Sequence, residues 1–354
     1  MGRNSIRMKT LKITAVVYLI GITYLLTSCD KLKKMENKEN FSWGASVTSA
    51  LGYPIEVHEG YLATKEKFIT EFSNAGIEDD GWDVNGADMG SGGNTIPTLV
   101  SLTWVSYAEK KFWKLDEAVL PKEKMLSLFR KGFENYDRVT KSLKHETYGQ
   151  IVVAVAPGGM VAIFLTGDHH RTEIARLQAK ATDVDVNEFY DNPHEHTQKQ
   201  FYDRLFEITV PKEIREKIAK KGIPFGLWDT YGEKYNWKFT PEFYKEDIFK
   251  YAHTTFFNGE EENIYEEELN KKLFYKNALP SRASIGFGKY WYKAEFDWDE
   301  VHGAFQALTK ENKDAEIEII AKVGFEYNDV EFIAKSNGRS IPLTKTKGNM
   351  WSNL

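Results

Sequence analysis

The same order of strand and helix signals occurs twice in this chain, and this recurrence constrains the fold more than any other feature. Each copy has an aromatic strand, a β-branched strand ending in a turn, further aromatic strands, a helix, a hairpin and one more strand. The order of elements predicts a tandem duplication; chance similarity is the alternative, because strand patterns are degenerate. The matched segments are residues 41–43 and 235–237, 58–61 and 253–259, 104–119 and 290–298, 121–132 and 299–308, and 151–179 and 317–343.

The individual elements follow from periodicity. The helix that opens at Pro121 carries Met125, Leu128, Phe129 and Phe133 at spacings of three and four residues. Alternation of apolar and polar residues predicts strands, and two further polar helices are expected. We therefore predict an α+β fold of mostly antiparallel β-sheets with a few packed helices. The strands are expected at residues 41–47, 55–63, 99–107, 112–119, 151–156, 161–166 and 172–179, and the polar helices at residues 193–206 and 211–220.

The charge pattern excludes one class of partner. The chain has 354 residues with 47 basic and 52 acidic side chains, which gives a net charge of −5. Because the basic residues are spread along the chain and form no patch, we expect no nucleic-acid partner. The length allows a large buried core in one or two domains.

The N-terminus has the three parts of an export signal. Arg3, Arg7, Lys9 and Lys12 precede an apolar run at residues 13–26, and Leu-Thr-Ser-Cys follows, ending at Cys29. A transmembrane anchor is the alternative, but as a helix this run is only about 21 Å long against a hydrocarbon core of about 30 Å. The pattern resembles the lipobox of bacterial lipoproteins, which implies cleavage before Cys29 and acylation of its sulfur.

Cys29 is the only cysteine of the chain. Once this sulfur is acylated, the mature protein has neither a disulfide nor a thiol for catalysis or metal binding. Two or more acyl chains make membrane attachment effectively permanent. Residues 30–40 are charged and offer little to bury, so they are expected to form a flexible tether.

These features predict a division of the chain into five parts. They are a lipoprotein signal peptide at residues 1–28, the lipidated cysteine and tether at 29–40, a first β-rich unit at 41–184, a helical connector at 185–222 and a second β-rich unit at 223–354.

The loops that differ between the two copies are the candidate binding regions. Residues 74–97 are rich in glycine and aspartate, and residues 260–268 form an acidic stretch. Both are expected to be loops at a cleft between the copies, where ligands are often bound, and their charge favours a basic partner. The candidate binding residues are Asp79, Asp80, Asp83, Asp88, Glu260, Glu261 and Glu262.

Other polar patterns carry weaker chemical signals. Glu56 and His58 lie two residues apart on a strand, as a general acid and base could, but a solvent-facing strand edge is the favoured explanation. The aspartates of residues 79–88 lack EF-hand spacing, and Gly90-Ser91-Gly92 lacks the context of a nucleophile elbow.

Two histidine groups are candidate metal ligands. His169-His170 and the pair His194 and His196 could meet at one zinc ion only if the chain folded back, and they show no recognised ligand spacing. We expect no metal and no cofactor.

Aromatic residues could form a binding platform for a glycan or a protein. Because alternate residues of a strand face opposite sides, most of this group is expected in the core. The group comprises Trp104, Tyr290, Trp291, Tyr292 and Trp298.

Several short motifs together resemble one family. The chain is similar to bacterial lipoproteins known as domain of unknown function 2931, and the similarity is expected to span the whole mature part. The resemblance supplies no assigned activity, ligand or catalytic residues to carry over, and the occurrence of some members beside secretion-system toxins implies a toxin-neutralising role. The motifs are the lipobox, residues 52–57 (GYPIEV), Gly81-Trp82, residues 289–292 (KYWY) and residues 341–343 (IPL).

We therefore expect a non-enzymatic binding protein, held at a membrane of the bacterial cell envelope by its lipid and facing the periplasm or the outside. Its partner is expected to be an envelope protein. The alternative is an envelope glycan hydrolase, which requires two carboxylates or a histidine pair converging in a pocket.

Overall fold

The computed structural model of the chain describes residues 40–137, 139–271 and 273–352. The chain divides into two units, residues 1–41 and 42–354. The predicted signal peptide, Cys29 and the tether up to residue 39 lie outside the described residues. Among the described residues, no helix combines the length and the apolar character that crossing a membrane requires.

The N-terminal part of the second unit, residues 43–182, is called the first half here. Its strands are β1 (Trp43–Ser49), β2 (Ile55–Ala63), β3 (Phe68–Glu71), β4 (Ile77–Glu78), β5 (Ala87–Gly93), β6 (Leu99–Ser106), β7 (Lys111–Val119), β8 (Phe133–Asp137), β9 (Ser142–Glu146), β10 (Gln150–Ala156), β11 (Met160–Gly167), β12 (His170–Gln178) and β13 (Lys180–Thr182). Helix α2 (Lys122–Lys131) follows β7.

Helices link this half to residues 235–352, called the second half. They are α3 (Val186–Phe189), α4 (Gln198–Thr209), α5 (Lys212–Lys221) and α6 (Leu227–Thr230). The second half contains β14 (Tyr235–Glu242), β15 (Phe249–Phe256), β16 (Glu261–Tyr265), α7 (Glu266–Asn270), β17 (Tyr275–Asn277), β18 (Pro280–Phe287), β19 (Tyr290–Glu295), α8 (Trp298–Thr309), β20 (Ile317–Val323), β21 (Val330–Ser336), β22 (Arg339–Pro342) and β23 (Lys347–Ser352).

The two halves have matching strand orders. In the first half one sheet runs β5-β1-β10-β11-β12, and in the second half the corresponding sheet runs β17-β14-β20-β21-β22. The other sheet runs β3-β2-β6-β7-β13 in the first half and β16-β15-β18-β19-β23 in the second. Each half contains one parallel pair, β1 with β10 and β14 with β20, among otherwise antiparallel neighbours. This correspondence is what a duplication requires, and the exact domain boundaries stay a prediction.

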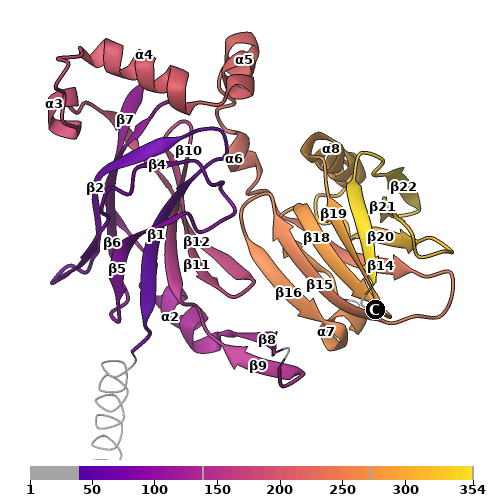
Figure 1. The fold of residues 1–354 in the computed structure, drawn as a ribbon. Coiled ribbons are helices and arrows are strands. Elements are labelled where there is room, and N and C mark those ends of the chain that lie inside the picture. Colours follow the sequence, from indigo (N-terminus) through magenta and orange to yellow (C-terminus); the bar gives the residue numbers. More distant parts are fainter. Residues whose placement is uncertain (1–39, 138, 272, 353–354) are drawn as a thin grey trace, which may run out of the picture. The chain divides into compact units, whose positions relative to one another are not determined.

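One sheet crosses from the first half to the second. Strand β12, at the end of one five-stranded order, pairs with β16 and so produces a ten-stranded sheet (Figure 1). The ladder between β12 and β16 has a single residue pair, Arg171 with Glu261. This contact point is called the junction below.

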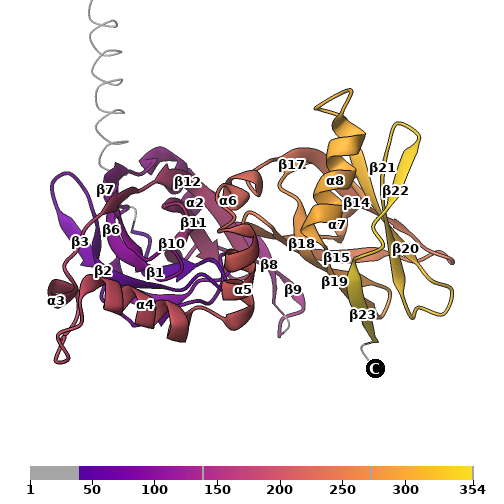
Figure 2. The same ribbon diagram turned by 90° about the horizontal axis from the view of Figure 1, so that it is seen from above.

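The core explains why some strands lack alternation. Strands β10 and β11 are buried along almost their whole length. One face contributes to a core cluster that includes Val152 and Phe164 as well as Phe201 of α4 and Trp228 of α6. Figure 2 shows these linking helices beside the first half. Strands that are covered on both faces have continuous apolar sequences without alternation. The second half has its own core, which includes Trp237 and Phe305.

The predicted α+β class with mostly antiparallel sheets is correct, and so are most elements. The predicted helix at Pro121 is α2, which begins one residue later and ends at Gly132, whose φ of 54° suits glycine. The turn after β10 uses Gly158 and Gly159 at φ 87° and 74°.

Two segments differ from the prediction. Residues 74–97 are not one polar loop, because they include β4, β5 and the buried Trp82 and Met89. Residues 260–268 form β16 and most of α7. By strand order β16 corresponds to β3, so these two acidic segments are not equivalent loops of the two copies.

Candidate functional site

The junction is held by side chains as well as by its single ladder pair. Trp82 donates its indole N–H to the carbonyl of Asn258 at 2.8 Å. Asp83, next to it, forms an ion pair with Arg282 of β18. Both contacts connect residues 82–83 of the first half with the second half.

Arg171 fixes the same segment from the other side. Its buried guanidinium donates to the carbonyl of Val84 at 2.8 Å and of Trp82 at 3.2 Å, and to the side chain of Asn85 at 3.0 Å. It also lies 4.2 Å from the centre of the Phe164 ring. Burial lowers the pKa of Arg171 to about 10, so the group stays charged at neutral pH.

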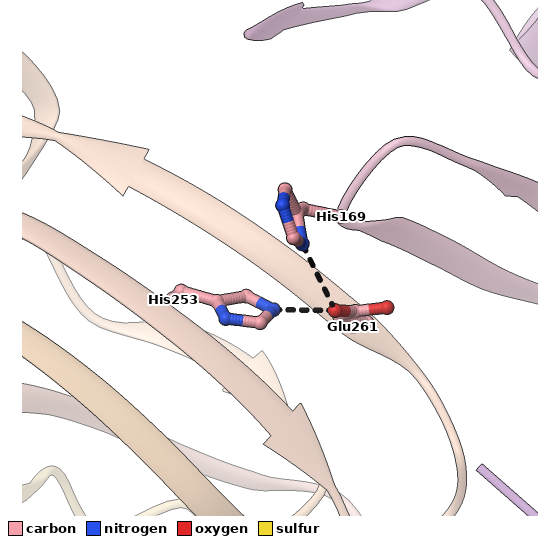
Figure 3. Close-up of side chains that lie close together, drawn as sticks. All are labelled: His169, His253 and Glu261. Atoms are coloured by element: carbon pink, nitrogen blue, oxygen red, sulfur yellow. Dashed lines mark hydrogen bonds and ion pairs between the residues drawn. The ribbon is translucent and has the colours of Figure 1, made fainter. Parts of the chain in front are cut away.

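Beside the junction, two imidazoles and a carboxylate converge (Figure 3). His253 Nε2 forms a hydrogen bond with Glu261, and His169 Nδ1 lies 3.7 Å from the same carboxylate oxygen. The rings of His169 and His253 are 4.9 Å apart between centres. One donor atom from each of the three residues lies within 4.8 Å of the others.

Strand pairing places these three residues. Glu261 opposes Thr255 on β15, and His253 opposes Asn263 on β16, so His253 and Glu261 form a diagonal pair on one face of the sheet. His169 comes from the turn between β11 and β12, where its φ of 54° is unusual for a residue other than glycine. Its side chain is about half exposed, whereas those of His253 and Glu261 are about one-fifth exposed.

The environment keeps the carboxylate of this cluster charged. Burial raises the pKa of Glu261, but the hydrogen bond with His253 and the charges of His253, His169 and Arg171 outweigh burial, and the pKa is below its usual value. His170 is engaged elsewhere: it stacks on Phe133 with ring centres 4.0 Å apart, and burial lowers its pKa. Only His169 of the adjacent pair therefore takes part in the cluster.

A second layer of polar groups surrounds the cluster. Asp168 lies 3.5 Å from Nε2 of His169 and accepts a hydrogen bond of 2.7 Å from Asn135 of β8. Asn135 in turn accepts from the hydroxyl of Tyr265 on β16 at 3.1 Å. The β8–β9 hairpin thus contacts both the turn that carries His169 and the second half.

The seven acidic residues predicted as binding residues are mostly engaged within the protein. Asp79 accepts from the backbone N–H of Gly52, Asp88 from Gln150, and Glu262 from Asn277 at 3.2 Å. Glu260 pairs with Lys234 at 2.7 Å. Asp83 and Glu261 are at the junction as described, and Asp80 is exposed. Ion pairs therefore engage Asp83, Glu260 and Glu261, whereas Asp79, Asp88 and Glu262 accept from neutral donors.

The other candidate polar groups are engaged as follows. Glu56 accepts hydrogen bonds from Tyr107 and Asn74, while His58 packs against the rings of Phe112 and Phe189. His194 and His196 lie near each other, with ring centres 5.7 Å apart. Among the described residues, His169, His253 and Glu261 form the group of histidine and carboxylate side chains that lies close enough together to hold a metal ion.

The aromatic residues considered as a binding platform are dispersed. Trp104 and Tyr292 are buried in the core. Trp291 packs on Tyr251, and Trp298 stacks on His302.

Sequence reasoning did not connect His253 with His169. The tandem pattern could have suggested that strands of the two halves meet, but it gives no register for such a contact. Glu261 was selected for its charge, whereas its neighbours in space make it a candidate ligand.

Comparison with known proteins gives one match. The family model described as Protein of unknown function (DUF2931) matches residues 31–226, more than half of the chain. The match includes the first half and the linking helices up to residue 226, but it does not reach residues 289–292 or 341–343, so the expected full-length similarity is too broad. No curated protein and no solved structure matches the chain significantly.

Proposed function

Because this chain belongs to the DUF2931 family of proteins of unknown function, we propose a function from its own residues: it is a lipid-anchored, non-enzymatic binding protein of the bacterial cell envelope. Its partner is a protein, and neutralisation of a toxin is the role that the family resemblance implies. The lipid on Cys29 is the membrane anchor. The folded unit faces the periplasm or the outside.

The sequence before the folded unit supports the anchor. The lipobox ends at Cys29, and the compact unit begins at Ser42. The sequence predicts that the charged residues between them form a tether with a span of roughly 20 Å. A tether of this length would suit a partner beside the membrane surface.

The β8–β9 hairpin is the proposed partner-binding surface. It forms a separate two-stranded sheet, and in the described part of the second half no strand lies between α8 and β20 at the corresponding place. Tyr136 and Leu143 are cross-strand neighbours, 47% and 50% exposed, and Val139 near the tip is 91% exposed. A contiguous patch of exposed apolar side chains is a feature of protein-binding surfaces.

The hairpin is also fixed in place. A lone two-stranded hairpin is marginally stable in water. Here Phe133 packs edge-on against Tyr148 with ring centres 5.2 Å apart, and the backbone N–H of Tyr136 donates to the hydroxyl of Tyr265 at 2.9 Å. A surface that is apolar and held in position loses little conformational freedom when it binds.

Photo-crosslinking in native envelopes tests this proposal. A photoreactive amino acid at Leu143 should give a defined crosslinked partner, and Tyr136→Ser should reduce that product at least about tenfold, as loss of a central aromatic contact does. The matched control is Phe325, 59% exposed in the second half, whose substitution by the photoreactive residue should not capture the same partner. Equal capture from both positions would contradict the proposal.

A glycan hydrolase is the second candidate function. The observation in its favour is the convergence of His169 and His253 with Glu261, since two histidines and a glutamate hold zinc in some hydrolytic enzymes. Purified protein incubated with envelope glycan and Zn²⁺ should release soluble fragments if this candidate holds, and Glu261→Gln should abolish their release. Absence of fragments from the unchanged protein would exclude it.

A further inference from the structure

We propose that His169, His253 and Glu261 bind one divalent transition-metal ion, with Zn²⁺ the best match, and that this ion joins the first half to the second. The site goes beyond the proposed function, and it holds whether or not a partner protein binds the hairpin.

The donor atoms are close to the geometry of a bound ion. Zinc bonds of about 2.1 Å in a tetrahedral arrangement place donor atoms about 3.4 Å apart. His169 Nδ1 and the Glu261 oxygen are 3.7 Å apart, and all three donors lie within 4.8 Å of one another. Adjustment falls mainly on His169, because its turn and half-exposed side chain allow movement, while strands β15 and β16 hold the other two.

The neighbouring groups orient His169 for metal binding. A histidine ligand usually directs its second ring nitrogen to a carboxylate or carbonyl, which fixes its tautomer. With Nδ1 facing Glu261, Nε2 of His169 faces Asp168 at 3.5 Å. Asp168 is itself held by the hydrogen bond from Asn135. This arrangement of carboxylate, histidine and ion is common around zinc.

The ligand types select the metal. Two imidazoles and one carboxylate suit Zn²⁺, Co²⁺, Ni²⁺ or Cu²⁺ better than Ca²⁺ or Mg²⁺, which prefer oxygen ligands. Three protein ligands leave the fourth position of a tetrahedral zinc ion for water or for a ligand from a partner.

The local charge permits a divalent cation. Glu261 and Asp168 supply two negative charges near the site. Arg171 is the opposing charge, but its guanidinium donates to Trp82, Val84 and Asn85. Those neutral oxygens stabilise the guanidinium charge and direct it toward the segment at residues 82–85.

An ion here would strengthen the contact between the halves. Glu261 belongs to the single ladder pair between β12 and β16, and His169 lies in the turn that leads into β12. Metal bonds from the first half to the second add to a connection that has only one residue pair in its ladder. A ligand that binds only the folded state raises its stability.

The test measures metal binding by the full chain, purified in detergent without a histidine tag and stripped with a chelator. Titration with Zn²⁺ should show one ion per chain, and Co²⁺ should give the visible absorption of a tetrahedral complex. Zinc at 100 times its dissociation constant should raise the melting temperature by about 5 °C.

Variants assign the site. His169→Asn, His253→Ala and Glu261→Gln should each weaken Zn²⁺ binding more than the 10–100-fold that loss of a second-layer partner causes. Asp168→Asn should weaken it within that range. The matched control is the double variant His194→Ala and His196→Ala. It removes two imidazoles that lie near each other but are not part of the proposed site, and it should bind Zn²⁺ as the unchanged protein does.

Three results would overturn the proposal: no stoichiometric binding by the unchanged chain, unchanged affinity in His169→Asn, or loss of binding in the control double variant. His169→Asn is decisive because asparagine tolerates a positive φ and the side chain is half exposed, so the metal-free fold should persist. Its metal-free melting temperature, compared with that of the unchanged chain, verifies this.

Discussion

Two tryptophans at related places in the halves differ in their hydrogen bonds. Trp43 begins β1 and is 3% exposed, and Trp237 lies near the start of β14 and is 4% exposed. The indole N–H of Trp237 donates to the carbonyl of Ala278 at 3.0 Å. The indole N–H of Trp43 is buried and meets no acceptor among the described residues.

Substitution of each tryptophan by phenylalanine should therefore have unequal effects. Both variants lose a similar volume of buried ring. Trp237→Phe also leaves the carbonyl of Ala278 without its donor, which costs about 1–3 kcal/mol, whereas Trp43→Phe removes a buried donor that has no partner. Trp237→Phe should lower the free energy of unfolding by about 2 kcal/mol more than Trp43→Phe.

Urea unfolding followed by far-ultraviolet circular dichroism measures this difference without relying on tryptophan fluorescence. If the halves unfold in separate transitions, each variant should shift only the transition of its own half, which also tests the predicted division of the chain. A loss of stability in Trp43→Phe equal to or greater than that in Trp237→Phe would refute the reasoning.

Three further outcomes are expected. Cys29→Ser should release the protein from the membrane fraction or leave an uncleaved precursor, and incorporation of a fatty-acid probe into this variant would contradict the lipoprotein assignment. The melting temperature should not change with dithiothreitol, because the chain has no second cysteine for a disulfide; a fall would oppose this. Burial, with Glu260 and Glu268 nearby, raises the pKa of Glu262 to about 7, so the folded state favours its protonated form and stability is lost as pH rises from about 4.5 to 7. Glu262→Gln should remove that loss, about 2 kcal/mol after allowance for partial exposure, and an equally steep pH dependence in the variant would show that another group is responsible.

Local patterns predicted most elements because their causes are local. The predicted strand at residues 55–63 coincides with β2, and the apolar runs of β10 and β11 were found within one residue at each end. The prediction was less successful for residues 74–97, where glycines and aspartates suggested a polar loop. Burial of Trp82 and Met89 and the pairing of β5 with β1 depend on residues distant in the chain.

The sequence by itself determined the class of fold and the succession of elements in two similar copies, and it predicts an N-terminal export signal. These properties depend on periodicity, turn residues and one cysteine, all of which act over a few neighbouring residues. Only the tertiary structure decided that β12 meets β16, and so that His169 lies beside His253 and Glu261. The physical reason is that a contact through one ladder pair needs no distinctive local pattern, while a one-residue change of register would turn Glu261 to the opposite face of the sheet.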